Sequence, residues 1–421
     1  MQLIHTFKQN KIDFNPIILF TTCFIILFLR RIDAFLNPQF WAEDGTIFYS
    51  QAYNLGVLKS LFVPHAGYLH TLPRLVAGIS QLIPLHYAPL LFNLVAITFQ
   101  IIPVLLFCSK RFETILPSVK LRLLISAIYL ALPNCFEIHS NLTNTHWYLT
   151  FLCFLVIIAP VSNTKFYFLF DIMIFLITGL STISSVMILP FVLGNYYLVG
   201  KNKTRKICLL ISLLTSIIQL SVLFSTSSRL SHNLFSSRNL DFLAKVLSNN
   251  VFLPSLIGLN RTSYLLKFLG GDLNDIPWNF IVYIIFTLSM MWLIYCLINS
   301  PQEIKMLILF SSVMTSITLL SMKSWELSIP PGNANRYYMF STITFIITWI
   351  WGLCQKQYWI KCVSFVIIST VIFVGITGDF THNPYTDFKF SYYAKEFEKI
   401  SAGTTYKIPI NPTWEMTLIK R

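Results

Sequence analysis

Long apolar stretches recur along the whole chain, and short polar connections separate them. Charged residues make up about a quarter of a typical soluble domain. Here they account for only 11% of 421 residues, while 55% are hydrophobic. A helix needs roughly 20 consecutive apolar residues to cross the hydrocarbon core of a bilayer. The pattern therefore predicts an all-α, polytopic membrane protein and argues against a soluble globular domain.

We expect about eleven transmembrane helices. The first apolar stretch has no small-residue cleavage site, so it is expected to remain as the first span rather than to be removed as a signal peptide. The predicted spans are 16–36, 87–108, 121–134, 146–160, 165–180, 186–200, 207–224, 280–298, 304–322, 337–354 and 360–377.

The basic residues of the short connections predict the orientation. Connections rich in Lys and Arg stay on the cytoplasmic side of a membrane. Placing the N-terminus in the cytoplasm and the C-terminus outside satisfies all of them, so the net charge of +14 is ascribed to topology rather than to nucleic-acid binding. The basic connections are 109–122, 201–206, 300–305 and 355–361.

This topology divides the chain into four regions, with the work expected on the outer face. No Gly-rich nucleotide loop or soluble ATPase domain faces the cytoplasm. The regions are 1–36, the cytoplasmic N-terminus and first span; 37–86, an outer loop with two membrane-parallel helices; 87–377, a multispan domain with an outer loop at 225–279; and 378–421, an outer tail.

Three amphipathic stretches are expected to lie along the outer membrane surface. The stretch 68–84 is too short and polar to span, and it places His70 and Arg74 on one helical face. A second helix is expected at 45–62 and a third at 242–258. The apolar stripe of the 45–62 helix consists of Phe48, Ala52, Leu55, Leu58 and Phe62.

An acidic pair, Glu43 and Asp44, follows the first span in the stretch "FWAEDG" (40–45). Asp44 could cap the helix that begins after it, because helix N-termini favour acidic side chains. The pair could also supply a general base whose pKa partial burial raises. Capping needs only one carboxylate, and the neighbouring Trp41 fits sugar or lipid contact. Both interpretations can hold at once.

An acidic pair in the first outer loop, followed by membrane-parallel helices and many spans, resembles the GT-C superfamily of membrane glycosyltransferases, including bacterial members that modify O-antigen (lipopolysaccharide) and other surface polysaccharides. The resemblance implies transfer of a sugar from a polyprenyl-phosphate carrier to a surface-glycan or lipid-linked hydroxyl, on the outer face of the bacterial cytoplasmic (inner) membrane. The stretches that carry it are 40–56 with 63–75, "NLTNTHWYL" (141–149), "PGNANRYYMF" (331–340) and "YKIPINPTWEM" (406–416).

On this resemblance Asp44 is the catalytic base, and Glu43 binds the acceptor or exchanges roles with it. Breaking a sugar–phosphate bond develops negative charge on the phosphate, which cations stabilise. The candidates for binding the donor phosphate are Arg336, Arg74 and Lys323. Arg336 could instead contact anionic lipid, and Arg74 could pair with Glu43 or Asp44.

Four aromatic or imidazole side chains are candidates for sugar or acceptor contact: Trp41, Tyr68, His146 and Trp147. Those at the start of the predicted span 146–160 are also typical of an interfacial aromatic belt. Two further residues, Arg30 and Arg31, lie at the outer end of the first span, where a lipid phosphate or an acidic partner could hold them.

No cofactor is expected beyond the donor itself, and no metal, because one carboxylate pair offers few oxygen ligands for a divalent ion. The expected partners are membrane lipids, a polyprenyl-linked sugar and a glycan acceptor. Two other functions stay open. A polysaccharide polymerase would use arginines of the outer loop such as Arg229, Arg238 and Arg261. A flippase or transporter for lipid-linked sugars would need more ionisable residues within the spans.

Overall fold

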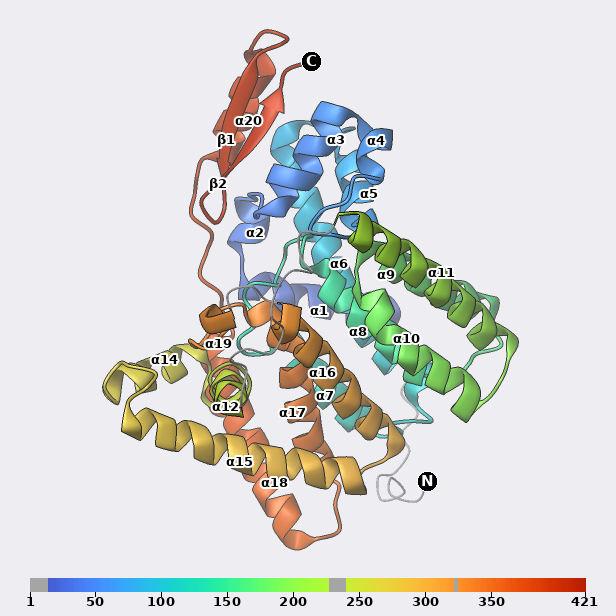
Figure 1. Ribbon diagram of the computed structural model, residues 1–421, viewed down its shortest axis with the longest axis vertical. Coiled ribbons are helices and arrows are strands. Elements are labelled where there is room, and N and C mark those ends of the chain that lie inside the picture. Colours follow the sequence, from blue (N-terminus) through green and yellow to red (C-terminus); the bar gives the residue numbers. More distant parts are fainter. Residues whose placement is uncertain (1–13, 227–239, 322–324) are drawn as a thin grey trace. The chain divides into compact units, whose positions relative to one another are not determined.

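The computed structural model describes residues 14–226, 240–321 and 325–421, and most of them are helical (Figure 1). The chain divides into two compact units, which we name after their contents. The hairpin unit comprises 16–106, 138–230 and 383–421, and the cavity unit comprises 1–15, 107–137 and 231–382.

The hairpin unit contains the first outer loop and the C-terminal tail. Its helices α8, α9, α10 and α11 pack against one another. Its elements are α1 (Pro16–Arg30), α2 (Asp33–Leu36), η1 (Asp44–Tyr49), α3 (Ser50–Leu55), α4 (Val57–Leu61), α5 (Thr71–Ser80), η2 (Leu85–Tyr87), most of α6 (Ala88–Cys108), α8 (Thr145–Ile158), α9 (Lys165–Ser181), α10 (Ser184–Gly194), η4 (Asn195–Val199), α11 (Lys203–Ser225), α20 (Phe390–Lys399), β1 (Thr405–Ile410) and β2 (Trp414–Ile419).

The cavity unit is built from helices alone in the residues that the structure describes. Its long helices α15, α16, α17 and α18 pack in sequence order. Its elements are η3 (Lys110–Phe112), α7 (Val119–Leu130), α12 (Leu240–Leu247), η5 (Ser248–Phe252), α13 (Leu253–Ile257), α14 (Leu259–Phe268), α15 (Ile276–Asn299), α16 (Gln302–Ser321), η6 (Trp325–Ser328), η7 (Asn335–Tyr338), α17 (Met339–Gly352), α18 (Tyr358–Thr370), η8 (Val371–Ile376) and α19 (Thr377–Asp379).

Helices occupy all eleven predicted spans, but their lengths differ. Several predicted spans coincide with shorter apolar helices, such as Thr145–Ile158, so the number of crossings and the orientation remain predictions. In the described part of the chain, six helical segments are long and apolar enough to cross a membrane: Leu85–Cys108, Lys203–Ser225, Leu240–Ile257, Ile276–Asn299, Gln302–Leu320 and Tyr358–Asp379.

The segment Leu240–Ile257 covers the stretch in which an interfacial helix was predicted, and by length and hydropathy it is a candidate span. The prediction placed this helix within the polar outer region 225–279. Asn249 and Asn250 are fully buried there, and their side-chain amides donate to backbone carbonyls, Asn249 to Ile329 and Asn250 to Ser328. Buried polar groups that are hydrogen-bonded in this way do not require contact with water.

The segment 45–62 was predicted as one continuous helix, but it is interrupted at Gly56. Gly56 adopts φ +90°, a left-handed conformation that ends α3 and starts α4 in a new direction. The expected apolar stripe is therefore divided. Phe48 and Ala52 are fully buried, whereas Leu58 and Phe62 are 79% and 76% exposed.

Helix α5 buries the polar face that was predicted to point outward, and it exposes its apolar face. His70 and Arg74, on the expected outward polar face, are buried, while an apolar stripe of Leu75, Ile79 and Leu82 is exposed. Exposed apolar and buried polar side chains suit a helix that faces lipid, because the surrounding hydrocarbon solvates the apolar stripe. This arrangement places a guanidinium inside the hairpin unit.

The C-terminal tail forms a β-hairpin that the all-α prediction omitted. Strand β1 pairs antiparallel with β2, and α20 packs on β1 (the red elements of Figure 1). The sequence signal is the period-2 alternation that buries one face of each strand. That face consists of Ile408, Ile410, Met416 and Leu418, each 0% exposed and part of a core that includes Phe40 and Phe48.

The hairpin turn holds the segment that leads into the acidic pair. The backbone N–H of Ala42 donates to the carbonyl of Asn411 at 2.6 Å, and the N–H of Asn411 donates to the carbonyl of Phe40 at 3.2 Å. Residues separated by about 370 positions in the chain thus fix the backbone on which Glu43 and Asp44 lie.

Candidate functional site

Asp44 lies inside the hairpin unit and is 1% exposed. Its Oδ2 accepts a hydrogen bond from the backbone N–H of Leu142 at 2.9 Å. Its Oδ1 has no hydrogen-bond partner among the residues that the structure describes. Glu43 is half-buried beside it, and Glu43 Oε2 accepts from the Thr143 hydroxyl at 3.4 Å. The acidic pair therefore faces the segment that precedes α8.

The predicted cap on the following helix does not form. Asp44 is the first residue of the π-helical segment η1, which has no side-chain cap at its N-terminus. The Asp44 carboxylate instead accepts a hydrogen bond from Leu142, in the segment that precedes α8. Asn141 folds this segment into a turn. Asn141 Oδ1 accepts from the backbone N–H of Asn144 at 3.2 Å and from its side-chain amide at 2.9 Å.

The electrostatics of Asp44 agree with the expected shift of a general base. Burial, the largest effect, raises the pKa of its carboxyl well above the usual range, and the charge of Glu43 adds to this rise. Hydrogen bonds from the backbone of Leu142 and Thr143 act in the opposite direction. A carboxyl with a raised pKa is a stronger base than a surface aspartate once it has lost its proton.

Arg31 is a buried cation of the same unit, and it contacts a tyrosine whose pKa also responds to Asp44. It is 2% exposed, and its Cζ lies 3.7 Å from the centroid of the Tyr385 ring. Its Nη2 donates to the carbonyl of Ser140 at 3.3 Å, and its Nε has no hydrogen-bond partner in the described residues. No carboxylate there lies within 4.0 Å of its guanidinium. The preceding Arg30 is also buried, 1% exposed.

Tyr385 connects Arg31 to the acidic pair. Burial, the largest effect, raises the pKa of its phenol, the charge of Arg31 lowers it, and the charge of Asp44 raises it. The phenol thus lies within the electrostatic influence of both charged residues. Its ring stacks on Trp41, with centroids 4.8 Å apart. Sequence reasoning singled out Trp41 but not Tyr385, which lies in the C-terminal tail and carries no local motif.

Arg74 and His70 form a second buried group. Arg74 is 0% exposed, and its Nη1 donates to Gln51 Oε1 at 2.9 Å. The suggested pairing with Glu43 or Asp44 is absent. His70 is 3% exposed, and its ring centroid lies 4.2 Å from that of Tyr68. Burial, followed by the charges of His146, His65 and Arg74, lowers the pKa of His70 well below its usual value.

His146 and Trp147 lie in the first turn of α8 and connect this second group to the acidic pair. The Nδ1 of His146 lies 2.8 Å from the carbonyl oxygen of Thr143, the residue whose hydroxyl binds Glu43. Trp147 is 5% exposed, and its ring lies 4.9 Å from that of His146. Both side chains are therefore packed within the unit rather than presented on its surface.

The remaining predicted cations lie elsewhere. Arg336 belongs to η7 of the cavity unit, where it forms an ion pair with Glu137 and lies 4.7 Å from the centroid of the Tyr337 ring. Lys323 falls outside the described residues, as do Arg229 and Arg238. Arg261 donates to the backbone carbonyl of Val374. Among the residues that the structure describes, no group of three or more His, Cys, Asp or Glu side chains could hold a metal ion.

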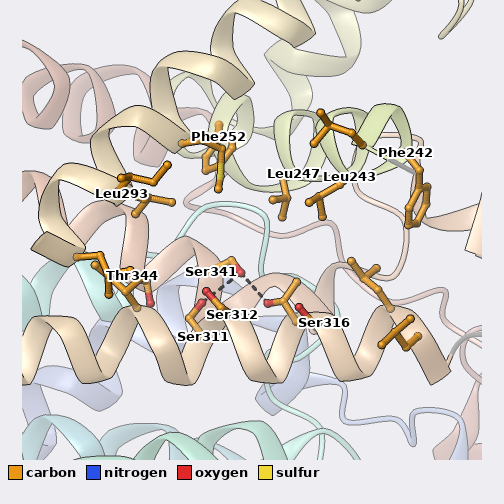
Figure 2. Close-up of a pocket in the computed structure, with 18 residues that line it drawn as sticks. Phe242, Leu243, Leu247, Phe252, Leu293, Ser311, Ser312, Ser316, Ser341 and Thr344 are labelled. Atoms are coloured by element: carbon orange, nitrogen blue, oxygen red, sulfur yellow. Dashed lines mark hydrogen bonds between the residues drawn. The ribbon is translucent and has the colours of Figure 1, made fainter. Parts of the chain in front are cut away.

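The cavity unit has a pocket of its own, about 640 Å³ in volume, between α12, α15, α16 and α17. Its walls are mostly apolar, with a patch of hydroxyl groups (Figure 2). Ser341 Oγ lies 2.7 Å from Thr315 Oγ1 and 3.3 Å from Ser311 Oγ. These hydroxyls largely satisfy one another, and the pocket carries no acid or base.

The chain matches no protein-family model and no curated protein. The chemistry of the site therefore has to be inferred from its own residues. The hairpin unit holds most of the residues singled out from the sequence, and it adds Tyr385. The residues already singled out are Arg31, Trp41, Glu43, Asp44, Tyr68, Arg74, His146 and Trp147.

Proposed function

We propose that the chain is a membrane glycosyltransferase with Asp44 as its general base. It moves a sugar from a polyprenyl-phosphate carrier to a hydroxyl of a surface glycan or a lipid-linked acceptor. The observation that carries the proposal is the Asp44 carboxyl, which is buried, held through Oδ2 by Leu142 and without a partner at Oδ1 among the described residues. Most buried polar atoms have a hydrogen-bond partner, so the unpartnered carboxylate oxygen calls for an explanation, and we ascribe it to the acceptor hydroxyl.

Arg31 is the preferred group for the donor phosphate. It follows α1, an apolar helix, so it lies at the end of a hydrophobic segment, where a lipid phosphate is expected. No acidic side chain in the described residues neutralises Arg31, and its Nε is available for an anion. The buried Arg30 adds a second guanidinium, which suits a leaving phosphate whose negative charge increases.

In the proposed step, Asp44 Oδ1 takes the proton of the acceptor hydroxyl. The acceptor oxygen forms a bond to the anomeric carbon while the bond from that carbon to the phosphate oxygen breaks. The electron pair of that bond leaves with the polyprenyl phosphate, which Arg31 stabilises. This single displacement inverts the configuration at the anomeric carbon. Trp41, which is only partly buried and stacks on Tyr385, is the aromatic residue that contacts the sugar beside the acid.

The proposal includes a location. The reaction takes place at the outer face of a bacterial cytoplasmic membrane, with the N-terminus inside and the C-terminus outside. The supporting observations are the long apolar helices and the basic short connections.

Glycan analysis of cells carrying Asp44→Asn or Glu43→Gln tests the proposal. Glu396→Gln is the matched control, because Glu396 is a surface carboxylate of the same unit paired with Lys399. Loss of one sugar substituent from a polysaccharide of normal length would support the transferase. Shortened chains would indicate a polymerase. An unchanged glycan, with Asp44→Asn protein present at the normal level, would refute the assigned base.

A further inference from the structure

The guanidinium of Arg74 has an unused hydrogen-bonding edge inside the hairpin unit. Its Nη1 binds Gln51, whereas its Nε and Nη2 have no partner among the described residues. Its Cζ lies 5.5 Å from the centroid of the Phe48 ring, and no carboxylate in that part of the chain is within 4.0 Å. A fully buried cation with two unsatisfied N–H groups is costly and calls for an explanation.

The charge of Arg74 persists at neutral pH. Burial lowers the pKa of its guanidinium to about 10, which leaves the group protonated at pH 7. The Nε and Nη2 hydrogens point along one edge of the planar guanidinium, and their spacing matches the two oxygens of a carboxylate or phosphate. The edge therefore fits an anion that binds through two oxygens.

His70 supplies a hydrogen-bond acceptor one helical turn before Arg74, whose backbone N–H donates to the carbonyl of His70 at 3.1 Å. Its Nε2 lies 3.1 Å from the carbonyl oxygen of His65, and because a carbonyl can only accept, Nε2 carries the proton. The lowered pKa keeps the ring neutral at pH 7, so Nδ1 bears a lone pair. This Nδ1 is buried and has no partner in the described residues. A ligand hydroxyl can donate to it.

We propose that the Nε–Nη2 edge of Arg74 binds the carboxylate of an acidic sugar in the acceptor glycan, while His70 Nδ1 accepts a hydrogen bond from a hydroxyl of the same sugar. We call these two groups the anion seat. This inference rests on the proposed function, in which the protein transfers a sugar to an acceptor. It specifies that the acceptor is an acidic glycan.

The contacts of α8 connect the anion seat to the base. The pKa of His70 responds to His146, and His146 approaches the carbonyl of Thr143. Thr143 in turn binds Glu43, next to Asp44. An acceptor sugar held at Arg74 would therefore reach the base by way of His146 and Thr143, whereas Arg31 and Tyr385 contact Ser140 and Trp41.

Charge favours a carboxylate over the leaving phosphate at this seat. One guanidinium and one neutral imidazole provide a single positive charge, which matches a monoanion. A leaving polyprenyl phosphate gains a second negative charge, which two adjacent guanidiniums such as Arg30 and Arg31 accommodate better.

Thermal unfolding of the purified full chain in detergent tests the seat without relying on sugar transfer. The probes are sodium glucuronate, its neutral amide glucuronamide, glucose, inorganic phosphate and sodium chloride at matched ionic strength. A ligand that binds only the folded state stabilises it by RT ln(1 + [L]/Kd), so a tighter ligand at the same concentration raises the unfolding midpoint further. We expect glucuronate to raise the midpoint of the wild-type protein and the neutral sugars to leave it unchanged.

The variants locate the binding. Arg74→Lys keeps the charge but loses the two-donor edge, and it should weaken glucuronate about 10- to 100-fold. Arg74→Gln should abolish the effect. Arg205→Gln is the matched control, because Arg205 is an arginine of the same unit that donates to the backbone of Gly200; it should respond like the wild type.

The proposal is overturned if glucuronate and glucuronamide act alike on the wild type, or if Arg74→Lys retains the full response. A response to phosphate but not to glucuronate that disappears in Arg74→Lys would also overturn it, since the seat would then hold the donor. Because the readout is binding, a failure of the transferase proposal would leave a positive result intact, and the reverse also holds.

Discussion

Two buried aspartates, one in each unit, differ in how completely their carboxylates are satisfied. Asp379 of the cavity unit accepts hydrogen bonds from the backbone N–H groups of Leu259 at 2.7 Å and Asn134 at 3.0 Å through Oδ2, and from Asn260 at 3.5 Å through Oδ1. Asp44 of the hairpin unit has one oxygen bound and one oxygen without a partner in the described part of the chain. Burial alone does not separate them, because both side chains are less than 10% exposed.

The arginines of the two units differ in the same way, in whether their charge has a partner. Arg336 of the cavity unit pairs with Glu137, so its charge is already neutralised. Arg31 and Arg74 of the hairpin unit are more deeply buried, and in the described residues neither has a carboxylate partner. A buried charge without a partner costs stability, so a protein that retains one has a use for it, and a ligand that completes the charge is such a use. This comparison is our reason for assigning the proposed reaction to the hairpin unit.

The largest expected effect comes from Asp44→Asn. We expect sugar transfer to fall about 10²- to 10⁴-fold, because the amide cannot take the proton of the acceptor hydroxyl. Initial rates with a polyprenyl-phosphate sugar measure this loss. Asp379→Asn, an identical change at the other buried aspartate, should leave the rate of the folded protein unchanged. Equal losses in the two variants would remove the distinction between them.

The next effect concerns the donor. We expect Arg31→Gln to lower kcat/KM for the donor about 10- to 100-fold, since a charged hydrogen bond to phosphate contributes about 1.5–3 kcal/mol. Steady-state kinetics with varied donor concentration measure it. Arg336→Gln is the comparison, and donor kinetics that depend on Arg336 rather than on Arg31 would reassign the phosphate site.

In their effect on the free energy of unfolding, the variants should rank in the opposite order from their effect on sugar transfer. Asp379→Asn should lower the free energy of unfolding by about 1–3 kcal/mol, because it weakens the acceptor of three backbone N–H groups. Arg336→Gln should also destabilise, since it removes the ion-pair partner of Glu137, which is 14% exposed. Asp44→Asn should not destabilise the fold at neutral pH. Denaturant unfolding of the three variants in the same detergent measures the ranking.

The smallest effect is a pH dependence that follows from the raised pKa of Asp44. Because the folded-state pKa lies above the unfolded value, the stabilising contribution of this carboxyl is fully present below the unfolded pKa. It is lost as pH rises through the folded pKa. The unfolding free energy of Asp44→Asn relative to wild type should therefore increase with pH, and a series between about pH 4 and 8 measures it.

The same shift predicts how activity depends on pH. The base form of Asp44 accumulates as pH rises, so the transfer rate should increase about tenfold per pH unit below the raised pKa and level off above it. Glu43→Gln removes a neighbouring charge that raises the pKa of Asp44, so this profile should move to lower pH. A profile that does not move would show that Glu43 does not influence the base.

Much of the helical framework could be predicted from the sequence, because apolar runs are a local property. Helices lie at all eleven predicted spans, and the acidic pair of segment 40–45 stands out by its position directly after the first of them. The break at Gly56 and the inverted faces of α5 were missed. Both depend on what surrounds a segment, since a helical pattern does not reveal whether lipid or protein faces its polar side.

The sequence by itself determined the class of the protein and the position of its acidic pair, because composition, hydrophobic runs and charge placement act over short distances. Only the tertiary structure decided which residues surround Asp44. Leu142, Arg31 and Tyr385 come from three distant segments, and no local pattern links them. Whether a buried charge has a partner is a property of the packed fold, and here it identifies the residues that we assign to the reaction.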